Sequence, residues 1–372
     1  MSTVRFVTLS TRSRLAESAV LARSLEAVHP GVPRLLVLVE REVTANDRTC
    51  GWEVLPVGSL ALPGGPRFLF QYPPFELCCA LKPYALAAAL ALPGTAGAVY
   101  LDGDMLAVAP FLDLVEAAWR DADVWLTPHL HTPAPAPDYA PLLHTGSYNA
   151  GFLAVAGGVE GRRFLDWLRE RLARDCVQDF RNGLFVDQKW LDLAVALFPG
   201  VRPLAYAGLN LGHWNLHEHR FEECSDGSIL LDGVVPLALF HFSGLTPDGL
   251  SRHGAGGAVP PSILALADRY RRAVAFKAST FHREAPYTYG RYADGAPIPP
   301  AHREAVRLGR SAAADPFRAR SDIEAASAGL VPPLPNGTEA LAADLQLRRL
   351  LAHPLIGRVW RFWKHWVNHD LP

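Results

Sequence analysis

The first sixty residues contain three short apolar runs, and between the first two the apolar residues recur at helical spacing. The runs at residues 4–10, 35–39 and 52–55 have the length of strands and consist mainly of apolar side chains. Between the first two runs, apolar residues recur at helical spacing over residues 13–28. Strand, helix and strand in this order predict right-handed βαβ units in a parallel sheet.

The alternation continues to residue 250. It predicts strands at residues 98–101, 124–127, 147–155 and 234–240, and helices at residues 76–90, 110–119, 161–174 and 187–194. Lys82-Pro83 should end or kink the first of these helices, because proline lacks an N–H and its ring clashes with the preceding turn. The proline- and glycine-rich residues 63–74 are predicted to form a loop. We expect an α/β fold with a sheet flanked by helices.

The pattern changes after residue 250, where helices alternate with proline-rich loops. A helix is predicted at residues 262–278, and Tyr287, Tyr289 and Tyr292 form an aromatic cluster after it. Residues 311–335 are rich in alanine, serine and proline and are predicted to link elements. These features divide the chain into a domain at residues 1–250 and a helical, proline-rich C-terminal extension at residues 251–372.

Composition narrows the class of protein. The 372 residues are 49% hydrophobic and 20% charged, which is typical of a globular protein with a large core. A formal net charge of −1, without a long basic run, argues against nucleic-acid binding. No secretory signal begins the chain, no apolar run reaches the length of about 20 residues that spans a bilayer, and the five cysteines lack regular spacing. We therefore expect a cytoplasmic protein with reduced thiols.

Two carboxylates, Asp102 and Asp104, follow the apolar run at residues 98–101 and are separated only by Gly103. Aspartate is rarely buried without a partner, so a carboxylate pair at the end of a buried strand calls for a counter-charge. Hard cations such as Mg²⁺ and Mn²⁺ prefer carboxylate oxygens. Two interpretations are open: a divalent-cation site, or a polar turn in which both carboxylates are solvated.

Other polar side chains stand where predicted elements begin or end. Ligands of open α/β sheets bind beyond the carboxyl ends of the strands, where Thr8-Leu9-Ser10 and His241 are expected. His241 is a candidate metal ligand or a hydrogen-bonded structural residue. Asp187 stands at the N-cap of the helix predicted over residues 187–194, and capping is its simplest role.

Lysine and histidine residues give further signals. Lys82 either begins a new helix that points at an anion or is an exposed side chain beside a helix start. His129, His131 and His144 fall in or beside the proline- and histidine-rich residues 129–141, without the regular spacing of a metal site. We interpret that segment as a mobile binding loop rather than a zinc site.

The ordered set of motifs resembles the sugar-nucleotide-dependent glycosyltransferases of the GT-A fold. The set is Lys82-Pro83, Asp102-Gly103-Asp104, Asn149-Ala150-Gly151, Asp187-Gln188 and His241-Phe242-Ser243-Gly244. It is most similar to the family-8-like retaining group, which includes glycogenin and bacterial lipopolysaccharide glycosyltransferases. Bacterial glycosyltransferases with signatures like Trp214-Asn215-Leu216-His217 are also similar. The resemblance covers residues 4–250 and implies a GT-A catalytic domain with a Rossmann-like, mixed, mostly parallel sheet.

The same resemblance implies roles for individual residues. Asp102, Asp104 and His241 would hold Mn²⁺ or Mg²⁺. The resemblance also implies that the donor is a nucleotide-sugar, and among these a UDP-sugar. Gln188 matches the residue that faces the anomeric carbon, and Asp187 is the alternative nucleophile. Because an amide is a poor nucleophile, a front-face reaction with retention is expected. The implied donor contacts are Thr8, Leu9, Ser10, Lys82, Asp102, Asn149, Gly151, Gly244 and Arg252.

The chain departs from the family pattern after His241, because no Lys-Pro-Trp follows. Arg252 and His253 are candidates to replace that lysine at the pyrophosphate. One alternative function is a nucleotidyltransferase, which normally carries a glycine-rich basic loop after the first strand. The corresponding segment here, Ser10-Thr11-Arg12-Ser13-Arg14, contains basic residues but no glycine. Another is a non-catalytic nucleotide-sugar-binding module, favoured if the three metal-ligand candidates do not converge.

The acceptor is not specified by these motifs and is expected to be a glycan, lipid-linked or protein acceptor. Near the C-terminus, residues 355–366 mix tryptophan with arginine and lysine, and their apolar side chains fall on one helical face. Such a face suits peripheral contact with the inner face of a membrane, or packing onto the catalytic domain.

Overall fold

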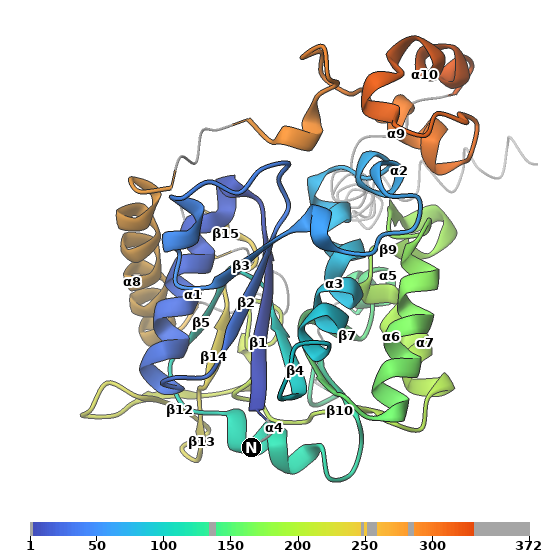
Figure 1. The fold of residues 1–372 in the computed structure, drawn as a ribbon. Helices are drawn as coiled ribbons and strands as arrows, with labels where there is room; N and C mark the ends of the chain where they lie inside the picture. Colours follow the sequence, from blue (N-terminus) through green and yellow to red (C-terminus); the bar gives the residue numbers. More distant parts are fainter. Residues whose placement is uncertain (1–2, 134–138, 247–248, 251–258, 282–285, 331–372) are drawn as a thin grey trace, which may run out of the picture.

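The computed structural model describes residues 3–133, 139–246, 249–250, 259–281 and 286–330 (Figure 1). Its centre is a seven-stranded sheet in the order β10-β6-β7-β4-β1-β2-β3. The strands are β1 (Thr3–Ser10), β2 (Arg34–Leu38), β3 (Glu53–Pro56), β4 (Thr95–Leu101), β6 (Val124–Pro128), β7 (Tyr148–Ala156) and β10 (Val201–Pro203). β7 runs antiparallel to both of its neighbours, and the other pairs are parallel. The predicted mixed, mostly parallel sheet is confirmed.

Helices cover both faces of the sheet (Figure 1). One hydrophobic core joins the sheet to α3 (Pro74–Leu90), α6 (Val159–Leu172) and α7 (Gln188–Leu197). The other joins it to α1 (Leu15–Val28), α8 (Pro261–Ala278) and the two-stranded ribbon of β5 (Met105–Ala107) and β14 (Leu239–His241). The chain is therefore a three-layer α/β structure, and β5–β14 places a short strand next to the turn that follows β4.

The remaining elements are short. They are α2 (Pro66–Phe70), α4 (Leu112–Ala118), α5 (Ala140–Thr145), α9 (Pro300–Arg307), α10 (Arg320–Ser327), β8 (Gln178–Asp179), β9 (Leu184–Phe185), β11 (Phe221–Glu223), β12 (Ile229–Leu231), β13 (Val235–Pro236), β15 (Leu245–Thr246) and β16 (Gly249–Leu250). None of the helices in the described part of the chain is long and apolar enough to cross a bilayer.

Three local predictions were wrong. α3 continues through Pro83, because ten of its residues are buried and their burial outweighs the roughly 3 kcal/mol cost of an internal proline. The loop predicted at residues 63–74 contains α2, which starts with Pro66 at a position that needs no N–H and buries Phe68 and Phe70. The strand predicted at residues 234–240 is instead the two strands β13 and β14.

The region after α8 packs onto the main sheet layer rather than only linking elements. Residues 311–335 contain α10 and a 3-10 turn, and Phe317 is buried in the same core as α3. The buried guanidinium of Arg303, on α9, donates to the carbonyls of Phe70, Tyr72 and Tyr289. The predicted aromatic cluster contributes Tyr289 to this core. The division into two domains at residue 250 stays a prediction.

Candidate metal centre and its surroundings

The two carboxylates of the Asp-Gly-Asp motif lie on the turn between β4 and β5, at the carboxyl end of the central strand. The N–H of Asp102 donates to the carbonyl of Gly151 at 2.9 Å, which ties the turn to β7. Both side chains are partly exposed. An added Cβ at Gly103 would stand 2.7 Å from Ser18 Oγ, so a larger residue here would have to displace that hydroxyl on α1.

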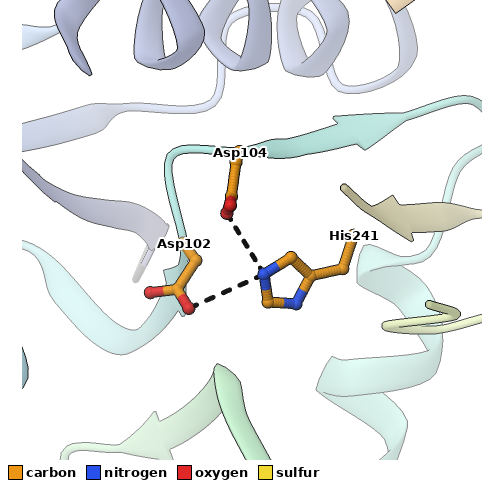
Figure 2. Close-up of side chains that lie close together, drawn as sticks. All are labelled: Asp102, Asp104 and His241. Carbon is orange, nitrogen blue, oxygen red and sulfur yellow. Dashed lines mark ion pairs between the residues drawn. The ribbon is translucent and has the colours of Figure 1, made fainter. Parts of the chain in front are cut away.

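His241 reaches the same point because β14 pairs with β5, with His241 opposite Met105. Its Nε2 lies 3.1 Å from Asp104 Oδ1 and 3.8 Å from Asp102 Oδ2 (Figure 2). The three ligand atoms lie within 4.8 Å of one another, and no other such group was found among the described residues. The side chains that the motifs singled out thus converge from two separate strands.

A buried amide fixes which ring nitrogen of His241 faces the carboxylates. Asn210 donates through Nδ2 to Thr127 Oγ1 at 2.7 Å and to Asn149 Oδ1 at 3.0 Å. Its Oδ1 is therefore the acceptor for His241 Nδ1, 3.0 Å away. With Nδ1 protonated, the Nε2 of neutral His241 presents its lone pair to the space between Asp102 and Asp104, the orientation that metal-binding histidines need.

The electrostatics of this group suit a cation. Burial lowers the pKa of His241, but the charge and hydrogen bond of Asp104, together with the charge of Asp102, outweigh burial and raise that pKa. Burial would also raise the pKa of Asp104, yet the imidazolium holds it below its usual value. Two carboxylates and one imidazole are donors that Mn²⁺ accepts, and a divalent ion would take the place of the proton on Nε2. The residues present therefore fit such an ion.

Lys82 is buried in the middle of α3, so neither interpretation offered for it was right: it does not begin a helix and it is not exposed. Its Nζ donates to the carbonyl of Ala150 at 3.0 Å and lies 3.0 Å from Asp187 Oδ2 and 3.5 Å from Asp102 Oδ1. Burial alone would lower the pKa of Lys82, but these two carboxylates raise it. Lys82 thus stays charged beside the metal-ligand candidates.

Asp187 does not cap α7, although it precedes the helix; its side chain accepts no cap hydrogen bond. The side chain instead turns to Lys82, and both are buried. Burial raises the pKa of Asp187, and the charge of Lys82 partly offsets that rise. The ion pair takes precedence over capping because a buried ammonium without a partner costs more than a lost cap.

Gln188 follows Asp187 as the first residue of α7, and its amide is held at both ends. Nε2 donates to the carbonyl of Thr145 at 2.9 Å, and Oε1 accepts from the N–H of Ala150 at 3.2 Å. Gln188 therefore lies against the start of β7, next to Asn149. Its predicted place facing a donor sugar stays a prediction.

Asn149 and Gly151 build the wall behind His241. Asn149 Oδ1 accepts from the N–H of Gly151 at 2.9 Å as well as from Asn210. An added Cβ at Gly151 would stand 2.5 Å from Cε1 of His241. Glycine is therefore required at residue 151 so that the imidazole can lie over the strand.

The other predicted donor contacts occupy several places. Thr8, Leu9 and Ser10 end β1, and all three are buried; Thr8 Oγ1 donates to the carbonyl of Leu101 at 2.7 Å. Gly244 follows β14 with a φ of +71°, which few other residues adopt. Arg252, His253 and residues 355–366 lie outside the described residues, so their predicted roles stay predictions.

The histidine-rich segment after β6 does not form a metal cluster in the part of it that is described. His129 is buried, and its Nδ1 donates to the carbonyl of Gly146 at 2.9 Å. Its Nε2 therefore accepts from Asn149 Nδ2, 3.3 Å away. Because both nitrogens are used by this neutral tautomer, His129 supports Asn149 and is not available as a ligand.

Burial lowers the pKa of His129 to about 4, which predicts a pH-dependent stability. The unfolded chain takes up this proton first as the pH falls, because its histidine pKa is about 6.5. The free energy of unfolding that the neutral His129 contributes is therefore fully present above pH 6.5. It decreases by about 3 kcal/mol between pH 6.5 and 4. We expect the free energy of unfolding of the wild type to fall by this amount relative to His129→Asn, measured by urea denaturation across that range. Parallel pH profiles for the two proteins would contradict it.

Comparison with known proteins gives distant similarities. No protein-family model matches the chain. The uncharacterised protein YfnF of Bacillus subtilis (strain 168) is 29% identical over 249 residues, which are 65% of this chain and 82% of YfnF. The galactosyltransferase LgtC, solved with donor and acceptor sugar analogues, is 14% identical with a TM-score of 0.47, over 73% of this chain and 95% of LgtC. The glycosyltransferase GlyE of Streptococcus pneumoniae TIGR4 is 11% identical with a TM-score of 0.44, over 78% of this chain and 67% of GlyE.

Motifs in the sequence point to the three converging residues, but none points to Asn210, which orients His241. Asn210 is 1% exposed and has a φ of +54°. Asparagine tolerates this left-handed conformation better than most residues. No spacing or motif in the sequence distinguishes it from the other asparagines, because its partners Thr127, Asn149 and His241 come from three different strands.

Proposed function

We propose that the protein is a metal-dependent glycosyltransferase that moves a sugar from a nucleotide-sugar, a UDP-sugar, to an acceptor with retention. The observation that carries the proposal is the convergence of Asp102, Asp104 and His241 on one point at the carboxyl end of β4. The order of the motifs, which resembles GT-A glycosyltransferases, supports the same conclusion. The convergence counts against a binding module without a metal site.

The proposed mechanism assigns the ion to the leaving group. Asp102, Asp104 and His241 would hold Mn²⁺ or Mg²⁺, which when bound stabilises the charge that grows on the departing nucleoside diphosphate. Lys82 keeps a positive charge 3.5 Å from Asp102 and holds that carboxylate in place together with the hydroxyl of Tyr100, 2.7 Å away. Asn210 and Asn149 keep His241 in the tautomer that can bind the ion.

Retention is proposed to follow a front-face route rather than a covalent intermediate. Asp187 is buried and paired with Lys82, so its carboxylate is not free to attack an anomeric carbon. Gln188 carries an amide, which is a poor nucleophile but whose oxygen can stabilise an oxocarbenium-like transition state. The side chains nearest to the proposed donor sugar therefore favour electrostatic stabilisation over covalent catalysis.

The test is donor turnover. Purified protein is incubated with a panel of UDP- and GDP-sugars, with and without Mn²⁺, and the release of nucleoside diphosphate is measured alongside donor binding by calorimetry. We expect slow, Mn²⁺-dependent hydrolysis of one UDP-sugar. Absence of donor binding across the panel would contradict the proposed function, and release of pyrophosphate from a nucleoside triphosphate would favour the nucleotidyltransferase.

A further inference from the structure

A buried carboxylate joins three segments of the chain beside the proposed catalytic site. Glu40 follows β2 and is 2% exposed. Its Oε1 accepts from the N–H of Arg12 at 3.0 Å, and its Oε2 accepts from the N–H of Thr288 at 3.0 Å and from the hydroxyl of Thr288 at 2.5 Å. Glu40 therefore ties the turn after β1 to the region after α8.

Thr288 is held from its other side by the residue that follows Glu40. Its hydroxyl accepts from the N–H of Arg41 at 2.9 Å while it donates to Glu40, so the donor and acceptor roles of the hydroxyl are both used. Arg41 Nε donates to the carbonyl of Thr288 at 3.1 Å, and the guanidinium lies over the rings of Tyr289 and Phe317. Figure 1 shows this region, in orange, beyond the end of the sheet that lies opposite the N-terminus. The region after α8 thus contacts the end of β2 through bonds that depend on one hydroxyl.

The turn after β1 lies next to the metal-ligand candidates. β1 and β4 are neighbours in the sheet, and an added Cβ at Gly103 would stand 3.9 Å from the carbonyl of Leu9. On the other side of β1, the N–H of Val39 donates to the carbonyl of Ser10 at 2.8 Å, and the next residue is Glu40. The turn that begins after Ser10 therefore lies between the Asp-Gly-Asp turn and Glu40.

The order of the strands indicates where a nucleoside would lie. Asn149 and Gln188, which we assign to the donor sugar, lie at β7, on one side of β4. The ion and the diphosphate would lie at the end of β4. Since ligands of open α/β sheets bind along this carboxyl edge, the nucleoside extends to the other side of β4, over β1 and β2. The turn that Glu40 holds is then the backbone that the nucleoside meets.

The position of this turn, rather than the charge of Arg12, is what Glu40 controls. The Nε and Nη2 atoms of Arg12 donate to the two carboxylate oxygens of Asp47, each at 3.0 Å, and Asp47 is 1% exposed. The guanidinium is therefore turned into the protein. The N–H of Arg12 remains the link between Glu40 and the backbone of the turn.

We propose that the region after α8 is part of the donor site, with Thr288 as a positioning residue that acts through Glu40 on the turn that receives the nucleoside. This inference rests on the proposed function, because it concerns binding of the donor at the same site. A side chain as buried as Glu40 does not touch the donor itself. Loss of the Thr288 hydroxyl removes one donor from Glu40 and lets the turn move, which weakens the contact with the nucleoside and leaves the ion in place.

The test separates the nucleoside from the metal-bound end of the donor. Thr288→Val keeps the shape of the side chain and removes its hydroxyl. We expect the Kd of UDP with Mn²⁺, measured by calorimetry, to rise about tenfold, while the Kd of inorganic pyrophosphate with Mn²⁺ stays within about twofold. In donor turnover, KM should rise about tenfold and kcat should stay within about twofold. A lower thermal stability with an unchanged Kd of UDP would show a purely structural role and overturn the proposal.

Two further variants serve as controls. Thr288→Ser keeps a hydroxyl at this position and should bind UDP within about twofold of the wild type. Thr3→Val is the matched loss of a threonine hydroxyl, because Thr3 lies at the opposite end of β1, is exposed and donates to the carbonyl of Gly94 at 3.2 Å; it should bind UDP as the wild type does. Equal weakening of UDP and pyrophosphate binding in Thr288→Val would also overturn the proposal. Failure of the wild type to bind UDP would instead contradict the proposed function.

Discussion

Replacement of Asp104 by asparagine should lower Mn²⁺-dependent donor turnover by about 100-fold or more. The amide keeps the size of the side chain but removes the charge that faces His241 Nε2, 3.1 Å away. A metal ion on the leaving group stabilises the transition state by several kcal/mol, and each 1.4 kcal/mol changes the rate by a factor of ten. Release of nucleoside diphosphate, measured over a titration of Mn²⁺, checks the prediction.

The control for this variant is Asp113→Asn. Asp113 lies in the first turn of α4 and is exposed, so the same chemical change should leave turnover within about twofold. Thermal unfolding of both variants should stay close to that of the wild type. Equal turnover by Asp104→Asn and the wild type would show that Asp104 does not hold the ion on which turnover depends.

Replacement of Lys82 by methionine should lower the free energy of unfolding by about 3–5 kcal/mol at pH 7. Methionine fills a similar volume but leaves the buried carboxylate of Asp187 and the carbonyl of Ala150 without their cation. Removal of one partner from a buried ion pair is costly because the other charge stays buried. Urea denaturation followed by circular dichroism measures the loss.

The stability that Lys82→Met loses should become smaller as the pH falls. Burial already raises the pKa of Asp187, and removal of Lys82 raises it further. A carboxyl with a raised folded-state pKa takes up its proton more readily in the folded chain, so acid relieves the penalty in the variant. Lys189→Met is the control, because the Lys189–Asp192 pair is partly exposed and should cost less than about 1 kcal/mol. A Lys82→Met loss as small as that of the control would contradict the buried pair.

Local patterns predicted the elements that place the site but not the partners of its charged residues. Short apolar runs located β1, β2 and β4, and the Asp-Gly-Asp turn follows β4 as expected. His241 was expected at the end of a strand, and it lies there. The pattern did not predict that β14 pairs with β5. This pairing brings His241 next to Asp104, although more than 130 residues of chain separate them.

Lys82 and Asp187 show why local rules failed. A lysine before a proline suggests a helix break, and an aspartate before an apolar helical pattern suggests a cap. Both rules consider only near neighbours in the sequence, whereas these two side chains lie 3.0 Å apart and are buried together. The energy of that contact exceeds the local preferences, and it depends on the packing of α3 and α7 on the same face of the sheet.

The proposed metal centre is tested most directly by counting bound Mn²⁺ by electron paramagnetic resonance, with and without UDP. We expect one Mn²⁺ per chain, bound more tightly when UDP is present, and we expect this ion to be lost in His241→Ala and in Asp104→Asn. Binding of Mn²⁺ that is the same in these variants as in the wild type would contradict a metal centre at Asp102, Asp104 and His241.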